Sequence, residues 1–233
     1  MKKLSAFVFF AASLIALQSA SAQTVDDIIA KHITALGGKE KLLSLNNVKM
    51  AGGMSVQGTD VSLTLTKQNN VASRTDIEVM GMSNYRIVTT AKGTVFMPIQ
   101  GMTEPQPMPA EDLKAGQAQL DLQSPMLNYK EKGNTVELDG TEKIGDEDNY
   151  KLKVTFKNGL VNTYFIGSKN NMINKTKGKR NINGEVTDIE TNYGDYKTNA
   201  DGYMFAYSVS GPTGDVTFDK IETNIKLDPS IFN

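Results

Sequence analysis

Residues able to do covalent or acid–base chemistry are scarce in this chain of 233 residues, which has no cysteine and one histidine, His32. A cysteine nucleophile is impossible, and any Ser-His-acid triad would need His32 as its base. His32 lies among apolar residues at helical spacing, a position more typical of a structural histidine than of a catalytic one. The chain also has no GxSxG, HExxH, P-loop or GxGxxG motif. The sequence therefore indicates no catalytic residue.

Two groups of carboxylates remain as candidates for chemistry. Asp146, Glu147 and Asp148 fall in a predicted turn, where acidic residues are usually solvated, and their spacing is not that of an EF-hand loop. The second group is Glu111 and Asp112. Because neither group suggests a reaction, we predict a protein that is not an enzyme and has no cofactor or metal site. Catalysis by His32 with the 146–148 carboxylates is the enzyme alternative.

The first residues have the pattern of a secretory signal. Lys2 and Lys3 precede an apolar run over residues 6–17, and the small residues 20–22 follow it. The run is too short to cross a bilayer comfortably, so we predict a signal peptide over residues 1–22, cleaved after Ala22. The remaining chain is then exported, and we expect it in a bacterial periplasm.

Bulk properties restrict the partners of the exported chain. Removing 22 of 233 residues leaves 211, which suits one domain, residues 23–233, stabilised by a hydrophobic core without disulfides. Taking two lysines from the 25 basic residues leaves 23 against 26 acidic ones, a net charge of −3. This balance argues against nucleic acid as a partner. We expect a monomer.

Hydrophobic periodicity predicts one helix followed by a sheet. Thr24 and Asp27 have capping-box spacing, an apolar stripe runs from Val25 to Leu36, and two glycines then end the helix. From residue 47 onward the period is two, as in "VSLTLTK" and "YKLKVTFK", which is typical of antiparallel strands with one dry face. We expect about eleven strands in meander order, with a bulge near residues 219–220. So many strands must curl, which predicts a half-open barrel with an apolar cavity.

The meander is interrupted by a proline- and methionine-rich segment, residues 96–129. Pro109 can begin a short helix, and Leu113 and Leu120 would lie on one face of it, although Gly116 weakens the helix. Such a helix persists only when it packs on something apolar. We therefore predict that the 96–129 segment is a lid on the cavity.

The cavity wall and the lid are the predicted ligand-binding surface. Flexible methionine side chains suit surfaces that repack around ligands of varying shape. The predicted ligand-contacting residues are Met54, Leu63, Leu65, Ile77, Met80, Met97, Met102, Met108, Leu113, Leu120, Met126, Phe156 and Phe165. A basic run over residues 175–180 is interpreted as a solvated strand edge protected by charge, with docking of an acidic partner or anionic lipid headgroups as the alternative.

Five passages together resemble a known superfamily. They are "IIAKHITALGGKEKLLSLNNVKMAGGM", "MPIQGMTEPQPMPAEDLK", "YKLKVTFKNGLVNTYFIGSKNNMINKTK", "ETNYGDYKTNADGYMFAYSVS" and "IETNIKLDPSIF". In layout and in scattered positions they resemble the periplasmic lipoprotein carriers of the LolA/LolB-like superfamily, especially its outer membrane lipoprotein-sorting relatives. The resemblance covers essentially the whole exported chain.

The resemblance implies a mainly β fold, a half-open antiparallel barrel of about eleven strands whose apolar cavity is covered by helices. It implies a non-catalytic carrier or binder of lipoprotein acyl chains or other hydrophobic ligands, with membrane-protein donors or acceptors as possible partners. It also implies an arginine on the cavity side that hydrogen-bonds the lid, for which Arg74, Arg86 and Arg180 are the candidates. The alternative is an envelope signalling or assembly protein that docks a protein partner on the same half-barrel.

Overall fold

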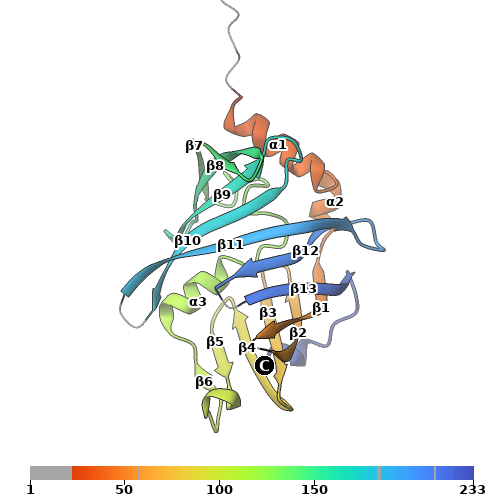
Figure 1. The fold of residues 1–233 in the computed structure, drawn as a ribbon, viewed down its shortest axis with the longest axis vertical. Coiled ribbons are helices and arrows are strands. Elements are labelled where there is room, and N and C mark those ends of the chain that lie inside the picture. Colours follow the sequence, from red (N-terminus) through yellow and green to blue (C-terminus); the bar gives the residue numbers. More distant parts are fainter. Residues whose placement is uncertain (1–22, 57, 183–184, 213) are drawn as a thin grey trace, which may run out of the picture.

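The structure, a computed structural model, describes residues 23–233 except 57, 183–184 and 213 (Figure 1). The predicted signal peptide, residues 1–22, lies outside the described residues. Among the helices that are described, none is long and apolar enough to cross a bilayer.

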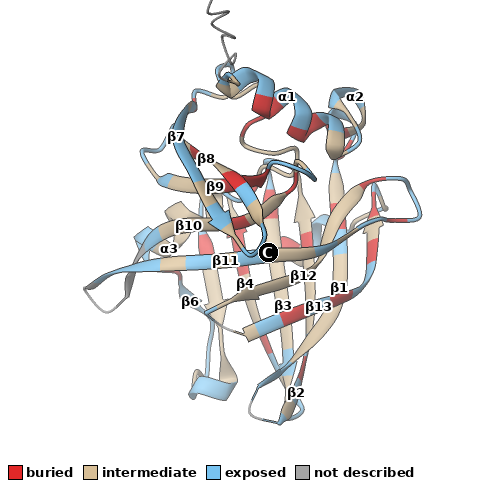
Figure 2. Ribbon diagram, turned by 45° about the horizontal axis from the view of Figure 1, so that its top comes forward, coloured by how far each residue is buried: buried red, intermediate tan, exposed pale blue. Residues whose placement is uncertain are grey.

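The N-terminal helix forms for the reasons seen in the sequence. α1 (Val25–Ala35) begins with a complete capping box, in which the Thr24 side chain accepts a hydrogen bond from the backbone N–H of Asp27 and the Asp27 carboxylate accepts one from the backbone N–H of Thr24. Its apolar stripe is buried against the sheet (Figure 2). Gly37 and Gly38 adopt positive φ angles of 110° and 93°, and the short α2 (Lys39–Leu43) follows.

The described residues form one antiparallel sheet of thirteen strands, two more than expected. The strands are β1 (Asn47–Val56), β2 (Thr59–Gln68), β3 (Ala72–Val79), β4 (Met82–Thr89), β5 (Gly93–Phe96), β6 (Gln106–Pro107), β7 (Thr135–Ile144), β8 (Glu147–Thr155), β9 (Val161–Gly167), β10 (Ile173–Ile182), β11 (Glu185–Thr198), β12 (Met204–Gly211) and β13 (Gly214–Thr223). One extra strand, β6, lies inside the interruption, and the other follows it.

The sheet consists of two meanders joined at their centre. The strand order runs from β6 back to β1, which pairs with β13, and then from β13 back to β7. Figure 1 shows the two meanders turned across one another, so that the sheet curls around an interior while β6 and β7 remain its two edges. The mainly β, half-open barrel predicted from periodicity and resemblance is therefore confirmed.

The β1–β13 junction contains the predicted bulge. Ala51 pairs with Lys220 and Gly52 pairs with Phe218, so Asp219 is the extra residue. A Cβ atom on Gly52 would lie only 2.0 Å from the carbonyl oxygen of Thr217, so the strands can approach this closely only with glycine here.

The interruption connects the two open edges of the sheet. After β5 come η1 (Pro98–Gln100), β6 and α3 (Ala110–Gln117), and turns then lead to β7. Of this segment, α3 and these turns cover the concave side, whereas residues 96–107 belong to the sheet edge or extend beyond it. The predicted helix is also shorter than expected: it ends at Gln117, so Leu120 lies outside it.

The C-terminal residues cover part of the outer, convex face. η2 (Pro229–Phe232) packs Phe232 against Ala72 and Ile87. The guanidinium of Arg74 donates to the carbonyl oxygen of Ile231 at 3.0 Å and pairs with Asp76 at 2.7 Å. Arg74 therefore lies on the convex face, away from the interior.

Candidate ligand-binding cavity

A cavity of about 270 Å³ lies inside the curled sheet beneath α3. Its walls come from β2, β3 and β4 on one side and from β12 and β13 on the other, and α3 with its flanking residues closes it. The lining residues are Leu63, Leu65, Lys67, Ser73, Thr75, Arg86, Val88, Met108, Asp112, Gly116, Gln119, Val209, Val216 and Phe218.

The apolar part of the lining follows from the alternation of the strands. Leu63 and Leu65 lie on one face of β2, opposite the outward-facing Thr64, and Leu63 packs in one cluster with Val216 and Phe218 of β13. Leu122, from the turns after α3, belongs to the same cluster. The interior is thus contacted by both meanders and by the covering segment.

The covering helix α3 rests on the wall through glycine contacts. A Cβ atom on Gly116 would lie 2.8 Å from a methyl carbon of Val88, and one on Gly93 would lie 2.8 Å from the Met108 side chain. The small residues therefore let α3 and its approach lie directly on β4 and β5. Gly116, expected only to weaken the helix, is the residue that permits its close docking.

Side-chain hydrogen bonds between described residues attach α3 to the β4 end and to the β8–β9 turn. The Gln117 side-chain amide donates to the carbonyl oxygens of Thr89 and Thr90 at 3.2 and 3.0 Å, and Asn158 donates to the carbonyl oxygen of Lys114 at 3.3 Å. No residue of α3 is fully buried. Because the helix is short and makes little buried contact, its opening costs less than that of a core element.

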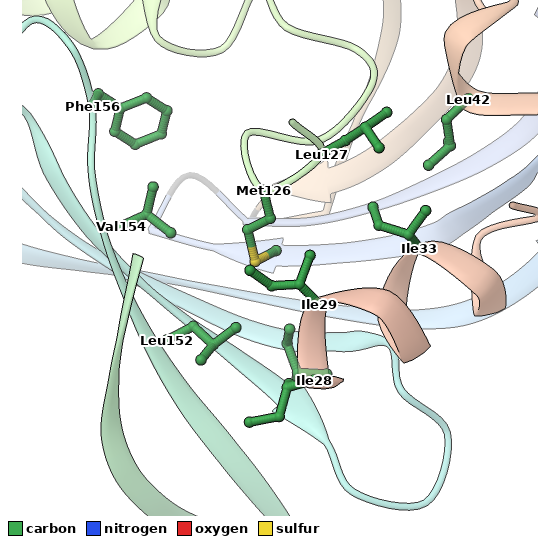
Figure 3. Close-up of a cluster of buried hydrophobic side chains, with 10 residues drawn as sticks. Ile28, Ile29, Ile33, Leu42, Met126, Leu127, Leu152, Val154 and Phe156 are labelled. Carbon is green, nitrogen blue, oxygen red and sulfur yellow. The ribbon is translucent and has the colours of Figure 1, made fainter. Parts of the chain in front are cut away.

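The turns after α3 are anchored much more firmly. Met126 and Leu127 are buried at 0% and 4% exposure in the cluster beneath α1, where Met126 points among the isoleucines of that helix (Figure 3). Lys132 pairs with Asp121 at 2.6 Å and donates to the carbonyl oxygen of Ser124 at 2.7 Å. This end of the interior is filled by the protein's own side chains, so the cavity is smaller than the predicted single lidded groove.

Two cationic side chains line the cavity: Lys67, which sequence reasoning missed as a site residue, and Arg86, one of the three candidate arginines. The Lys67 ammonium donates to the carbonyl oxygen of Gln119 at 3.2 Å, and burial lowers the pKa of Lys67 to about 8. Arg86 faces the same cavity from β4. A signal existed for Lys67, since it continues the alternation of Leu63 and Leu65 onto the dry face.

The structure brings only part of the predicted set together. Leu63, Leu65 and Met108 line the cavity, while Leu113 and Leu120 pack behind them with Met108 and Val88. Ile77 pairs with Leu63 across β2 and β3, and Met54 packs in the cluster of Leu63. The binding role of these residues stays a prediction.

The other predicted residues lie elsewhere. Met126 and Phe156 belong to the filled end beneath α1. Met97 and Met102 contact each other near η1, where the Met102 sulfur lies 3.4 Å from the Met97 nitrogen. Met80 is 74% exposed in the β3–β4 turn, so it lies outside the cavity beneath α3 and lines, with Met54, a more open hollow over the turns.

Phe165 was placed on the wrong face. Its neighbour Ile166 packs beneath α1, so Phe165 points to the convex side, where it pairs with Lys175 in the sheet. The Lys175 ammonium lies 4.3 Å from the ring centroid and covers it. Phe165 is therefore buried without facing the cavity.

The basic run lies on β10, which pairs with β9 and β11, so it is not the strand edge interpreted from the sequence. Lys175 pairs with Glu142 at 2.9 Å, and Lys177 pairs with Glu190 at 2.7 Å. Of the three candidate arginines, Arg74 is on the convex face, Arg86 is on the cavity side, and the side chain of Arg180 lies outside the described part. Arg86 is thus the described arginine that faces the lid.

Larger hollows are more open to solvent. One of about 630 Å³ lies over the β1–β2 and β3–β4 turns, and one of about 550 Å³ lies between α1 and residues 126–131. A third, of about 720 Å³, begins beyond the end of α3 and is lined in part by Leu120 and Phe156. The cavity beneath α3 differs from them in combining residues of α3 with residues of β2, β3, β4, β12 and β13.

The chain was compared with known proteins. Its sequence matches no protein-family model and no curated protein. Its structure is similar to that of a LolA superfamily protein from Nitrosomonas europaea, with a TM-score of 0.55 and 16% identity over 91% of this chain and 98% of that one. It is similar to a DUF1329 family protein from Desulfovibrio piger, with a TM-score of 0.56 and 9% identity over 91% and 98% of the two chains.

A third similar structure is a putative outer membrane lipoprotein-sorting protein domain from Vibrio parahaemolyticus. Its TM-score is 0.50 and its identity is 12% over 89% of this chain and 95% of that one. At these identities the likeness shows the fold alone. The LolA-like fold expected from the resemblance is confirmed.

Proposed function

We propose that this protein is a periplasmic, non-catalytic carrier or binder of a hydrophobic ligand that carries an acyl chain. The observation that carries the proposal is the cavity beneath α3, which has an apolar wall and a cover with no fully buried residue. An apolar wall of this kind favours binding of an acyl chain, because each methylene removed from water contributes about 0.8 kcal/mol to the binding free energy.

The cover and the firmly anchored turns have separate tasks in this proposal. The segment around Met126 and the Lys132–Asp121 pair keep the interior in shape. α3 is joined to it but rests lightly on β4, so α3 can lift while the barrel stays folded. The likeness in fold to a LolA superfamily protein and to a putative outer membrane lipoprotein-sorting protein domain supports such a role.

The test begins with the exported protein purified without detergent, followed by solvent extraction and mass spectrometry of any bound lipid. A fluorescent acyl probe is then titrated into the stripped protein. We expect probe binding that Leu65→Asp abolishes, because the charge falls on the cavity wall. Val186→Asp is the matched control, since Val186 is 68% exposed on β11.

Two results would count against the proposal. The first is the absence of both copurified lipid and probe binding. The second is equal loss of probe binding in the Leu65 and Val186 variants, which would mean that the probe does not bind in the cavity beneath α3. Recovery of one stoichiometric protein without lipid would favour the alternative of a docking protein.

A further inference from the structure

Two cations face the cavity from strands that flank β3. Lys67 on β2 pairs with Ser73 of β3, and Arg86 on β4 pairs with Thr75 of β3. The two side chains therefore project from the same face of the sheet, and their backbones lie about 10 Å apart across the strands and about 7 Å apart along them, roughly 12 Å in all. Lys and Arg side chains are long enough to meet around one group placed between them, beside the hydroxyls of Ser73 and Thr75.

These cations differ from the other sheltered lysines of the chain. Lys132 and Lys175 each have a carboxylate partner, at 2.6 and 2.9 Å. Lys67 has instead a single neutral acceptor, the Gln119 carbonyl oxygen at 3.2 Å. Among the described residues Arg86 has no hydrogen-bond or ion-pair partner, although Asp112 of α3 also lines the cavity.

A buried cation with few hydrogen-bond partners destabilises the folded protein, because burial removes the water that stabilises its charge. The lowered pKa of Lys67 is a consequence of this cost. Replacing Lys67 by an apolar residue would lengthen the row of leucines on β2 and remove the cost. A cost of this kind is characteristic of binding sites, where an added ligand completes the pairing.

The opposite wall of the same cavity is apolar. Val209, Val216 and Phe218 face the two cations across the interior, and Leu63 and Leu65 adjoin them. The cavity thus has a cationic side and an oily side. Its volume of about 270 Å³ lies just below the usual range for small-ligand sites, roughly 300–1,000 Å³. It suits a single chain better than several.

Resting on the proposed function, we propose that the ligand is a single-chain amphiphile with an anionic head. Lys67 and Arg86 bind the head, either a carboxylate or a phosphate, and the chain lies along Leu65, Val216 and Phe218. The planar guanidinium of Arg86 can donate two parallel hydrogen bonds to either kind of head, which a neutral head does not match.

The experiment compares three probes with the same twelve-carbon chain on the stripped, full exported protein at pH 7. Dodecanoate, dodecyl phosphate and dodecanol are titrated calorimetrically, each below the concentration at which it aggregates. We expect both anions to bind at least tenfold more tightly than the alcohol. The ratio between the two anions identifies carboxylate or phosphate as the preferred head.

Variants then assign the preference to the two cations. The double variant Lys67→Gln/Arg86→Gln is expected to lose the anion preference while keeping its affinity for dodecanol. Arg86→Lys keeps the positive charge but loses the two parallel N–H donors of the guanidinium, so we expect an intermediate preference for the anions over dodecanol. Lys49→Gln, on the exposed face of β1, is the matched control and should bind like the unmodified protein. Circular dichroism and melting confirm that each variant folds.

The possible failures are distinguishable. If dodecanol binds as tightly as the anions and the double variant changes nothing, the anionic head is wrong while acyl binding stands. The head assignment is also wrong if the anion preference persists in the double variant. If none of the three probes binds, the proposed function itself fails.

Discussion

The imidazole Nδ1 of His32, on α1, lies 2.8 Å from the backbone carbonyl oxygen of Asn171, in the turn between β9 and β10. Nδ1 therefore carries the imidazole proton and donates a hydrogen bond to the carbonyl oxygen. Nε2 is buried and has no hydrogen-bond partner among the described residues. Because a second proton would have to sit on Nε2 in a desolvated place, burial lowers the pKa of His32 below its ordinary value of 6.5.

This contact predicts a loss of stability in mild acid. The folded state keeps His32 neutral, whereas the unfolded chain binds a proton below about pH 6.5. The contribution of neutral His32 is thus complete above that pH and falls as the pH drops toward the lower folded pKa, at most by about 1.4 kcal/mol per pH unit. Urea unfolding between pH 8 and pH 5 measures it.

The control for this prediction is His32→Leu, which removes the titrating group from the same buried position. Carboxylates titrate alike in both proteins, so the difference in unfolding free energy between them isolates His32. A difference that does not change between pH 8 and pH 5 would mean that His32 accepts a proton in the folded state.

The lowered pKa of Lys67 predicts a change in stability at alkaline pH, whereas that of His32 acts in mild acid. The pKa of Lys67 is about 8 in the folded protein, against about 10.4 for an unperturbed lysine. Folding is therefore penalised in full below pH 8, and the penalty disappears as the pH rises past about 10.4. We expect Lys67→Met to raise the unfolding free energy at pH 7 by about 1–3 kcal/mol, after a discount for the partial exposure of the side chain.

The measurement is urea unfolding of Lys67→Met and of the exposed control Lys49→Met at pH 7. Only the first is expected to gain stability. The same Lys67 variant should bind dodecanoate more weakly, so stability and binding would move in opposite directions. A lower unfolding free energy for Lys67→Met would show that the Lys67 ammonium is stabilised by hydrogen-bond or ion-pair partners within the protein itself.

Regular elements could be predicted from the sequence because one residue pattern decides them. The capping box of Thr24 and Asp27 fixes the start of α1, and the alternation of Leu63 and Leu65 fixes the dry face of β2. The phase slip at residue 219 correctly locates a bulge, because an extra residue must reverse the alternation.

Other features could not be predicted because hydrophobic periodicity does not determine them. Tyr164, Phe165 and Ile166 are consecutive large apolar residues, so alternation alone cannot assign Phe165 to either face. The covering segment has a helix of only two turns, and its path depends on contacts with distant strands. Lys67 was not among the predicted site residues, because lysine is seldom buried, although its position in the alternation places it inside.

The convex position of Phe165 can be tested against Phe218, which lines the cavity. Both rings are largely buried, so either change to alanine is expected to cost about 3–5 kcal/mol of stability. Only Phe218→Ala should weaken probe binding to the folded protein, because Phe165 lies under the Lys175 ammonium on the other face. The measurement pairs urea unfolding with a probe titration at a temperature where both variants are folded. Equal loss of probe affinity in the two would contradict this placement.

The contact between α3 and β4 offers a direct test of whether the cover moves. A Cβ atom on Gly116 would lie 3.5 Å from the Cβ atom of Val88, within the separation that a disulfide requires. The chain has no cysteine of its own, so Val88→Cys/Gly116→Cys would form one defined bridge that fastens α3 to the wall. The exchange of Val88 for the smaller cysteine also removes the methyl carbon that would clash with a side chain at 116.

We expect the oxidised double variant to release a bound acyl probe at least tenfold more slowly than the unmodified protein, because α3 can no longer lift. Adding a reductant should restore the rate, and the two single-cysteine variants should not respond to oxidation. Stopped-flow fluorescence of probe displacement measures these rates on the full exported protein. A release rate that is the same before and after reduction would mean that the ligand leaves by another route, such as the open hollow beyond the end of α3, and that α3 is a fixed wall.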